Sequence, residues 1–89
     1  MNKEEFTQYA IEKIKFNVMS ANDYAKLGNT YQAELKGGAV ITLIGCLNQM
    51  GIHSDCECDT AVNGVMVFRS VTVDGQKIFD CSEKTSRFL

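Results

Sequence analysis

The sequence predicts an α+β fold in which a helical hairpin is followed by a three-stranded antiparallel β-meander, in the order ααβββ. Apolar residues recur at helical spacing as far as Met50. The period then changes to two, as in strands with one buried face. Two dipeptides typical of hairpin turns, Asn63-Gly64 and Asp74-Gly75, divide this second half into three strands.

A first helix is expected over about residues 3–27. Asn2 followed by Glu5 is the signature of a capping box, and Gly28 is a typical residue just after a helix end. An alternative ends this helix near Ser20, which would cap a second short helix. A single seam with spacings of three and four favours one continuous helix. It consists of Ile11, Ile14, Val18, Ala21, Ala25 and Gly28.

A second helix is expected over residues 30–50. Asn29 and Gln32 indicate a second capping box, and Gly51 marks the helix end. The stripe expected to pack inward consists of Tyr31, Leu35, Ala39, Leu43, Leu47 and Met50.

Small and apolar residues also lie beside this stripe. Gly37 and Gly45 are inside the helix, where glycine costs about 0.5–1 kcal/mol relative to alanine, so they indicate close packing. Val40, Ile44 and Cys46 fall on a further side. The second helix is therefore expected to be buried on more than one side.

The three strands are expected over residues 52–62, 65–73 and 76–81, with a polar, frayed tail over 82–89. All of this fits one domain, because a chain of 89 residues supports one modest core.

Two-residue turns would fix the register of these strands. The predicted opposite pairs are Cys56 with Val71, Cys58 with Arg69, Arg69 with Asp80, and Val71 with Ile78. The face expected to pack on the helices carries Cys56, Cys58, Val65, Val67, Val71, Val73 and Ile78, with Arg69 and Asp80 as an ion pair at its margin.

The opposite sheet face would then carry an exposed apolar patch, which usually marks a protein contact. Its predicted partner-binding residues are the anchors Met66, Phe68 and Phe79, rimmed by Asp55, Glu57 and Asp59. Self-association through this patch is an alternative. Coverage by the C-terminal tail is another.

Composition excludes several partner classes. The net charge is −2, and the nine Lys and Arg residues are scattered, so no direct contact with nucleic acid is expected. The most apolar run, Gly37 to Leu47, would extend only about 16 Å as a helix and cannot cross a membrane. No signal peptide is visible, so the protein is expected in a cytosol with reduced cysteines.

No cofactor, metal or catalytic site is expected. Cys56 and Cys58 would point to one sheet face, whereas His53 and Cys81 would point to the other, so four zinc ligands would not converge. The same alternation separates His53 from Cys56, which argues against a catalytic thiol and against an enzyme. Cys81 is expected to be the most accessible of the four cysteines.

The stretch LGNTYQAELKGGAVITLIGCLNQMGI, from Leu27 to Ile52, resembles a helical segment of small phage and prophage accessory proteins. Shared features are a capped turn, a Gly/Ala-spaced apolar helix, and an ending like Leu47-x-x-x-Gly51-Ile52. The resemblance implies action by binding: many characterised proteins of this class block host defence, as anti-CRISPR proteins or as sponges for nucleotide signals.

The leading functional hypothesis is therefore a non-enzymatic phage or mobile-element protein that inhibits a host defence protein, such as a CRISPR effector, in the host cytosol. One alternative is an oligomeric sponge that encloses a nucleotide signal with Lys13, Lys15, Asn17 or Arg69. Another is a structural or assembly module without inhibitory activity.

Overall fold

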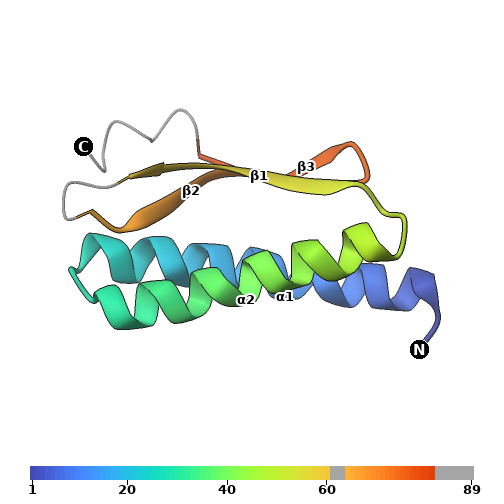
Figure 1. Ribbon diagram of the computed structural model, residues 1–89, viewed down its shortest axis with the longest axis horizontal. Coiled ribbons are helices and arrows are strands. Elements are labelled where there is room, and N and C mark those ends of the chain that lie inside the picture. Colours follow the sequence, from blue (N-terminus) through green and yellow to red (C-terminus); the bar gives the residue numbers. More distant parts are fainter. Residues whose placement is uncertain (61–63, 82–89) are drawn as a thin grey trace.

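Two layers make up the part of the chain that the computed structural model describes, residues 1–60 and 64–81. Helices α1 (Lys3–Lys26) and α2 (Thr30–Gln49) run antiparallel and cover one face of a sheet (Figure 1). The sheet is antiparallel, in the order β1-β2-β3, with strands β1 (Ser54–Thr60), β2 (Met66–Val73) and β3 (Gln76–Asp80). The predicted ααβββ order is confirmed.

The local signals at both ends of α1 are confirmed, and at the start of α2 the Asn29 side chain accepts from the Gln32 N–H at 3.2 Å. The Asn2 side chain accepts from the Glu5 backbone N–H at 2.8 Å, and the Glu5 carboxylate accepts from the Asn2 N–H at 3.1 Å. Gly28 follows α1 with a φ of +79°, a conformation that glycine adopts without strain. Helix α1 passes through Ser20 without a break. The predicted Asn63 turn position and the tail over 82–89 lie outside the described residues.

The buried side of α1 is as predicted, and that of α2 is as predicted only in part. Helix α1 buries the predicted residues Ile14, Val18, Ala21 and Ala25. On α2 the buried residues are Ala33, Gly37, Val40, Ile44 and Leu47. Of the predicted stripe, Leu47 is buried and Leu43 and Met50 pack against the core, whereas Tyr31 and Leu35 are 70% and 54% exposed.

The burial of Gly37 follows from how closely the sheet approaches α2. A Cβ built on Gly37 would lie 3.5 Å from Cε2 of Phe68, so the inner side of α2 has room only for small residues there. Apolar residues lie on two sides of α2, and periodicity alone does not show which side is buried. In the described chain, no helix combines the length and hydropathy that a bilayer span requires.

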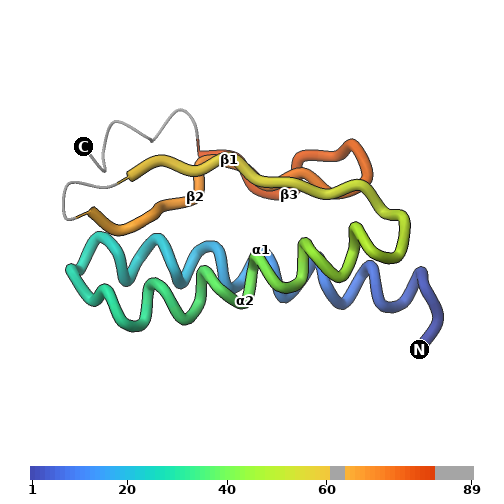
Figure 2. The backbone as a smooth tube through the Cα atoms, in the orientation of Figure 1, coloured from blue at the N-terminus to red at the C-terminus, as the bar shows by residue number. Residues whose placement is uncertain are grey.

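A β-bulge in β2 overturns part of the predicted register. Cys56 is opposite Val71, as expected, but Cys58 is opposite Phe68 rather than Arg69. Arg69 is the extra residue of the bulge, because Ser70 pairs with Glu57. The first residues of β2 also step toward the helices (Figure 2). Consequently Val67 and Phe68 are both buried, at 2% and 1% exposure.

A second irregularity shifts β3 against β2. Ser70 is opposite Asp80 and Val71 is opposite Phe79, so the predicted pairs of Arg69 with Asp80 and Val71 with Ile78 are wrong. The ladder skips Ile78 between the pairs Val71–Phe79 and Thr72–Lys77. A two-residue turn fixes register only next to the turn, and bulges further along reset it.

Two asparagine side chains fasten the sheet to the helices. Asn22, 4% exposed on α1, accepts from the Phe68 backbone N–H at 2.8 Å and donates to the Phe68 carbonyl at 3.0 Å. Asn48, near the end of α2, makes the same pair of bonds to Ser54 at 2.8 and 2.9 Å. Each amide therefore bonds to both the N–H and the carbonyl of one residue of the sheet.

Candidate protein-interaction surfaces

The predicted aromatic anchors lie on the helix side of the sheet. Phe68 belongs to the core beside Gly37, and Phe79 is partly buried against the same core cluster. Their predicted place on the outer face is wrong, because the two bulges change which side chains turn inward. The ring of Phe68 is therefore not accessible to a partner.

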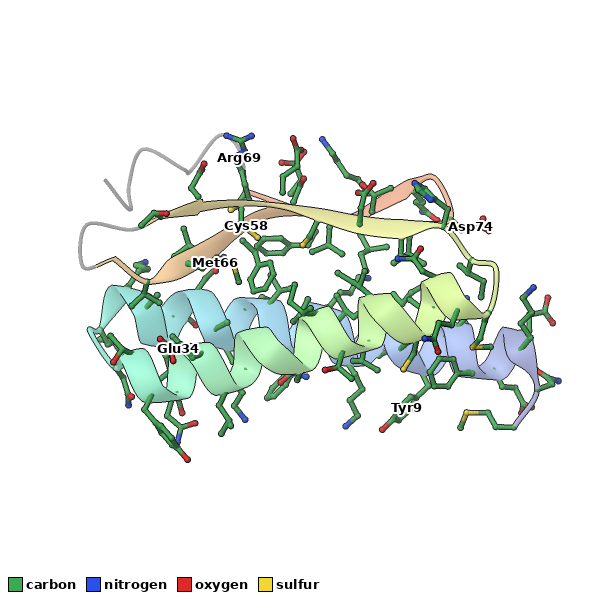
Figure 3. The ribbon with its side chains drawn as sticks, viewed as in Figure 1. Tyr9, Glu34, Cys58, Met66, Arg69 and Asp74 are labelled. Carbon is green, nitrogen blue, oxygen red and sulfur yellow. The ribbon has the colours of Figure 1, made fainter. Side chains whose placement is uncertain are left out.

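Met66 is exposed, at 42%, but it also lies between the sheet and α2 (Figure 3). Its methyl carbon would be 3.9 Å from a Cβ on Gly37. Together with Glu34, Gly38 and Ile41 it lines a groove of about 440 Å³ along one flank of α2. Met66 is thus accessible, but from the helical side.

The three predicted rim acids do lie on the outer face of the sheet, where Glu57 and Asp59 meet Arg69 rather than an apolar patch. The Arg69 guanidinium projects away from the helices (Figure 3). It lies 3.6 Å from Glu57 Oε2 and 3.5 Å from Asp59 Oδ1. The imidazole of His53 is 3.6 Å from Asp55. The bulge thus removes Arg69 from the inner face, where it was expected, and supplies the acids with a partner.

The outer sheet face is in consequence polar and internally paired. The Ser70 hydroxyl donates to Glu57 at 2.9 Å, and Lys77 lies 3.7 Å from Asp80. Among the described sheet residues, Met66 is the one large apolar side chain with substantial exposure, and it belongs to the other side. Within residues 54–60 and 64–81, this face therefore carries none of the exposed aromatic anchors on which the predicted interface depended.

The cysteines do not form a reactive or metal-binding cluster in the described part of the chain. Sγ of Cys56 and Sγ of Cys58 are 3.9 Å apart on the inner side of the sheet. Burial and the neighbouring Cys56 thiol raise the pKa of Cys58 to about 12, so its nucleophilic thiolate is scarce. No group of three potential ligands gathers among the described residues. Cys46 is exposed and Cys81 half-buried, so Cys81 is not the most accessible thiol.

The residues suggested for a nucleotide site do not converge. Lys13 Nζ lies over the Tyr9 ring, 5.6 Å from its centroid, and the Asn17 amide donates to the Lys13 carbonyl. Arg69 is on the other layer, paired with acids. A second hollow of about 530 Å³, between the start of α1 and Asp74, contains none of these residues.

Exposed apolar side chains gather instead on the helices. On α1, Tyr9, Phe16 and Met19 are 47%, 64% and 59% exposed. Tyr9 points away from the sheet (Figure 3), and Phe16 follows two helical turns later on the same side. With three exposed acids they form a row spaced by four and three residues, which we name the α1 seam: Glu5, Tyr9, Glu12, Phe16, Met19 and Asp23.

Helix α2 carries a matching row with different chemistry. The α2 seam has the same spacing and is exposed throughout: Tyr31, Leu35, Gly38, Thr42, Gly45 and Gln49. It contains no charged residue. Sequence reasoning missed both rows as surfaces; the available signal was a second apolar periodicity on each helix, displaced from the buried one.

Comparisons with known proteins assign no family to this chain, because no family model, curated protein or solved structure matches it. The chemistry of its surfaces therefore has to indicate what it does. Two exposed seams on one helical layer, one of them with aromatic and methionine side chains, are suited to binding.

Proposed function

We propose that this chain acts by binding another protein, and that the α1 seam makes the contact. The observation that carries the proposal is the exposure of Tyr9, Phe16 and Met19 in one row. A helix that offers anchors at this spacing fits an apolar groove on a partner. Aromatic residues and methionine are also the side chains enriched at protein interfaces.

The charges of the α1 seam indicate the chemistry of the partner. Glu5, Glu12 and Asp23 alternate with the apolar anchors, and the row contains no base. A surface with basic residues around an apolar groove would complement it and would be steered toward it at low salt. Lys13 lies beside the row, where its contact with Tyr9 helps to orient that ring.

Basic surfaces of this kind are typical of nucleic-acid-binding proteins, including RNA-guided effectors with their positively charged channels. The resemblance of residues 27–52 to phage accessory proteins supports the same class. The proposed function is accordingly the inhibition of a host defence protein, with a CRISPR effector as the leading candidate, by a phage or mobile-element protein in the host cytosol.

The test is phage plating on a CRISPR-immune host that expresses this chain. The wild type should restore plating, and the double variant Phe16→Ser with Met19→Ser should lose most of that effect. Met66→Ser is the matched control, because it removes an exposed methionine outside the seam and should behave as the wild type.

Binding of the purified effector to each variant, measured at two salt concentrations, completes the test. We expect the double variant to bind at least about tenfold more weakly, and the wild type to bind less tightly at high salt. Equal plating and binding by all variants would contradict the role of the α1 seam. Binding without any effect on plating would favour the assembly role.

A further inference from the structure

The α2 seam has no partner within the described chain, although its helix is apolar on two sides. From Gly37 to Met50 the sequence contains no charged residue. A helix that is apolar around most of its circumference normally has both sides covered. One side of α2 packs on α1 and the sheet, while Tyr31, Leu35 and Thr42 on the other are exposed.

The glycines of α2 separate into two kinds. A Cβ on Gly37 would be in van der Waals contact with the Phe68 ring at 3.5 Å, so packing inside the molecule accounts for a small residue there. A Cβ on Gly38 or Gly45 would meet nothing within 4 Å. Glycine destabilises a helix relative to alanine, and here no contact within the described chain explains it. Both glycines lie on the α2 seam, where a close approach from outside would use them.

We propose that the α2 seam pairs with the α2 seam of a second copy, in an antiparallel arrangement about a two-fold axis level with residue 40. Leu35 then lies opposite Gly45, Gly38 opposite Thr42, and Tyr31 opposite Gln49. The bulky Leu35 meets a gap, and the small Gly38 meets the larger Thr42. A two-fold interface requires this self-complementarity, which a foreign partner would not require.

The distribution of charge also favours a second copy of the chain as the partner of the α2 seam. Residues near a two-fold axis meet their own copies, so a charge there would face a like charge. The α2 seam has none, and its flanking Glu34 would lie level with Cys46 of the second copy. The α1 seam paired in the same way would oppose Glu5 to Asp23, two acids. Self-pairing therefore fits α2 and disfavours α1, which stays free for the proposed partner.

The area of the α2 seam sets the strength of such a dimer. Helix α2 has 20 residues and so extends about 30 Å, and at a helix diameter of about 10 Å its outward side offers each copy about 300 Å². This is less than the roughly 800 Å² that each partner buries in a standard interface, so the dimer should be weak and should form as the protein concentration rises. The pairing goes beyond the proposed function and does not depend on it.

The experiment is sedimentation equilibrium of the purified chain without any partner protein. The wild type should approach twice 9.9 kDa, about 20 kDa, as its concentration rises. Gly45→Leu fills the gap opposite Leu35, and Leu35→Glu places a charge in the seam. Each should weaken dimerisation at least about tenfold while circular dichroism stays that of the wild type. Phe16→Ser, on the α1 seam, is the control and should dimerise normally.

Cross-linking tests the register. In a Cys46→Ser background, chains with Gly38→Cys mixed with chains with Thr42→Cys should form a disulfide-linked pair more readily than either variant alone. A wild type that is monomeric at every concentration would overturn the pairing. So would a dimer that Gly45→Leu leaves intact, or one without the preference for positions 38 and 42. None of these outcomes bears on the phage-plating test, so the two proposals fail independently.

Discussion

The outer faces of the two layers differ in whether their side chains have partners within the chain. On the sheet, Arg69 lies between Glu57 and Asp59, so the charges there already have partners within the chain. On the helices, Phe16 and Tyr31 are 64% and 70% exposed. A face whose charges are paired internally gains little from a partner, whereas exposed aromatic rings gain by leaving water. The helical layer is therefore the face suited to binding.

The largest expected difference between the two layers is in the rates at which their thiols react. Cys46 is exposed on α2, whereas burial and Cys56 raise the pKa of Cys58 to about 12. Mild alkylation of the native protein near pH 8 should label Cys46 at least about a hundredfold faster than Cys58. The alkylating reagent reacts with the thiolate, and a raised pKa leaves little of Cys58 in that form. Peptide mass spectrometry at timed quenches measures both rates. Faster labelling of Cys58 would show that the inner side of the sheet is open.

Truncation of Phe68 should cause the largest loss of stability. Phe68→Ala leaves a cavity beside Gly37 and should cost about 3–5 kcal/mol in urea unfolding. Met66→Ala, at an exposed position two residues earlier, should cost less than about 1 kcal/mol. Were Phe68→Ala as stable as Met66→Ala, the ring would be a surface anchor after all, and the comparison of the layers would reverse.

Removal of the Asn22 amide should have an intermediate effect. Asn22→Ala leaves the buried Phe68 N–H without its acceptor and should cost about 2–3 kcal/mol. The control is Asn17→Ala on the same helix, whose amide bonds only to the carbonyl of Lys13 one turn earlier. We expect that control to unfold within about 0.5 kcal/mol of the wild type. Equal losses for both variants would argue against the attachment of β2 to α1 through Asn22.

Arg69→Ala should have the smallest effect. The Arg69 side chain is 39% exposed, and surface ion pairs contribute less than about 1 kcal/mol. The small loss should shrink further in high salt, since salt screens exposed charges. A salt-independent loss above about 2 kcal/mol would mean that the outer sheet face is covered, contrary to the comparison above.

The local parts of the fold could be predicted from the sequence. The Asn2–Glu5 capping box and the glycines after each helix act within a few residues, so the sequence displays them directly. The change of period after Gly51 likewise locates the strands. These signals give the order of the elements and their bounds to within a few residues.

The interaction surface was predicted on the sheet because the bulge that changes the sheet faces has no local signature. The second apolar periodicity on each helix was the signal that pointed to the seams. Nothing beside Arg69 marks it as the extra residue of a bulge, and that bulge helps to turn Phe68 inward. Asn22 was the available hint: it falls four residues after Val18 and three before Ala25, within the buried seam. A polar residue at such a position indicates a specific buried bond, here to β2.

Carbene footprinting at two protein concentrations tests most directly whether the helices or the sheet form the contact face. The two samples should bracket the concentration at which the chain associates. Peptides from α2, with Tyr31 and Leu35, should lose labelling in the concentrated sample, while peptides from β1, with Asp55 and Glu57, should be labelled equally in both. Loss of labelling on β1 and β3, with α2 unchanged, would contradict the account and return the interface to the sheet.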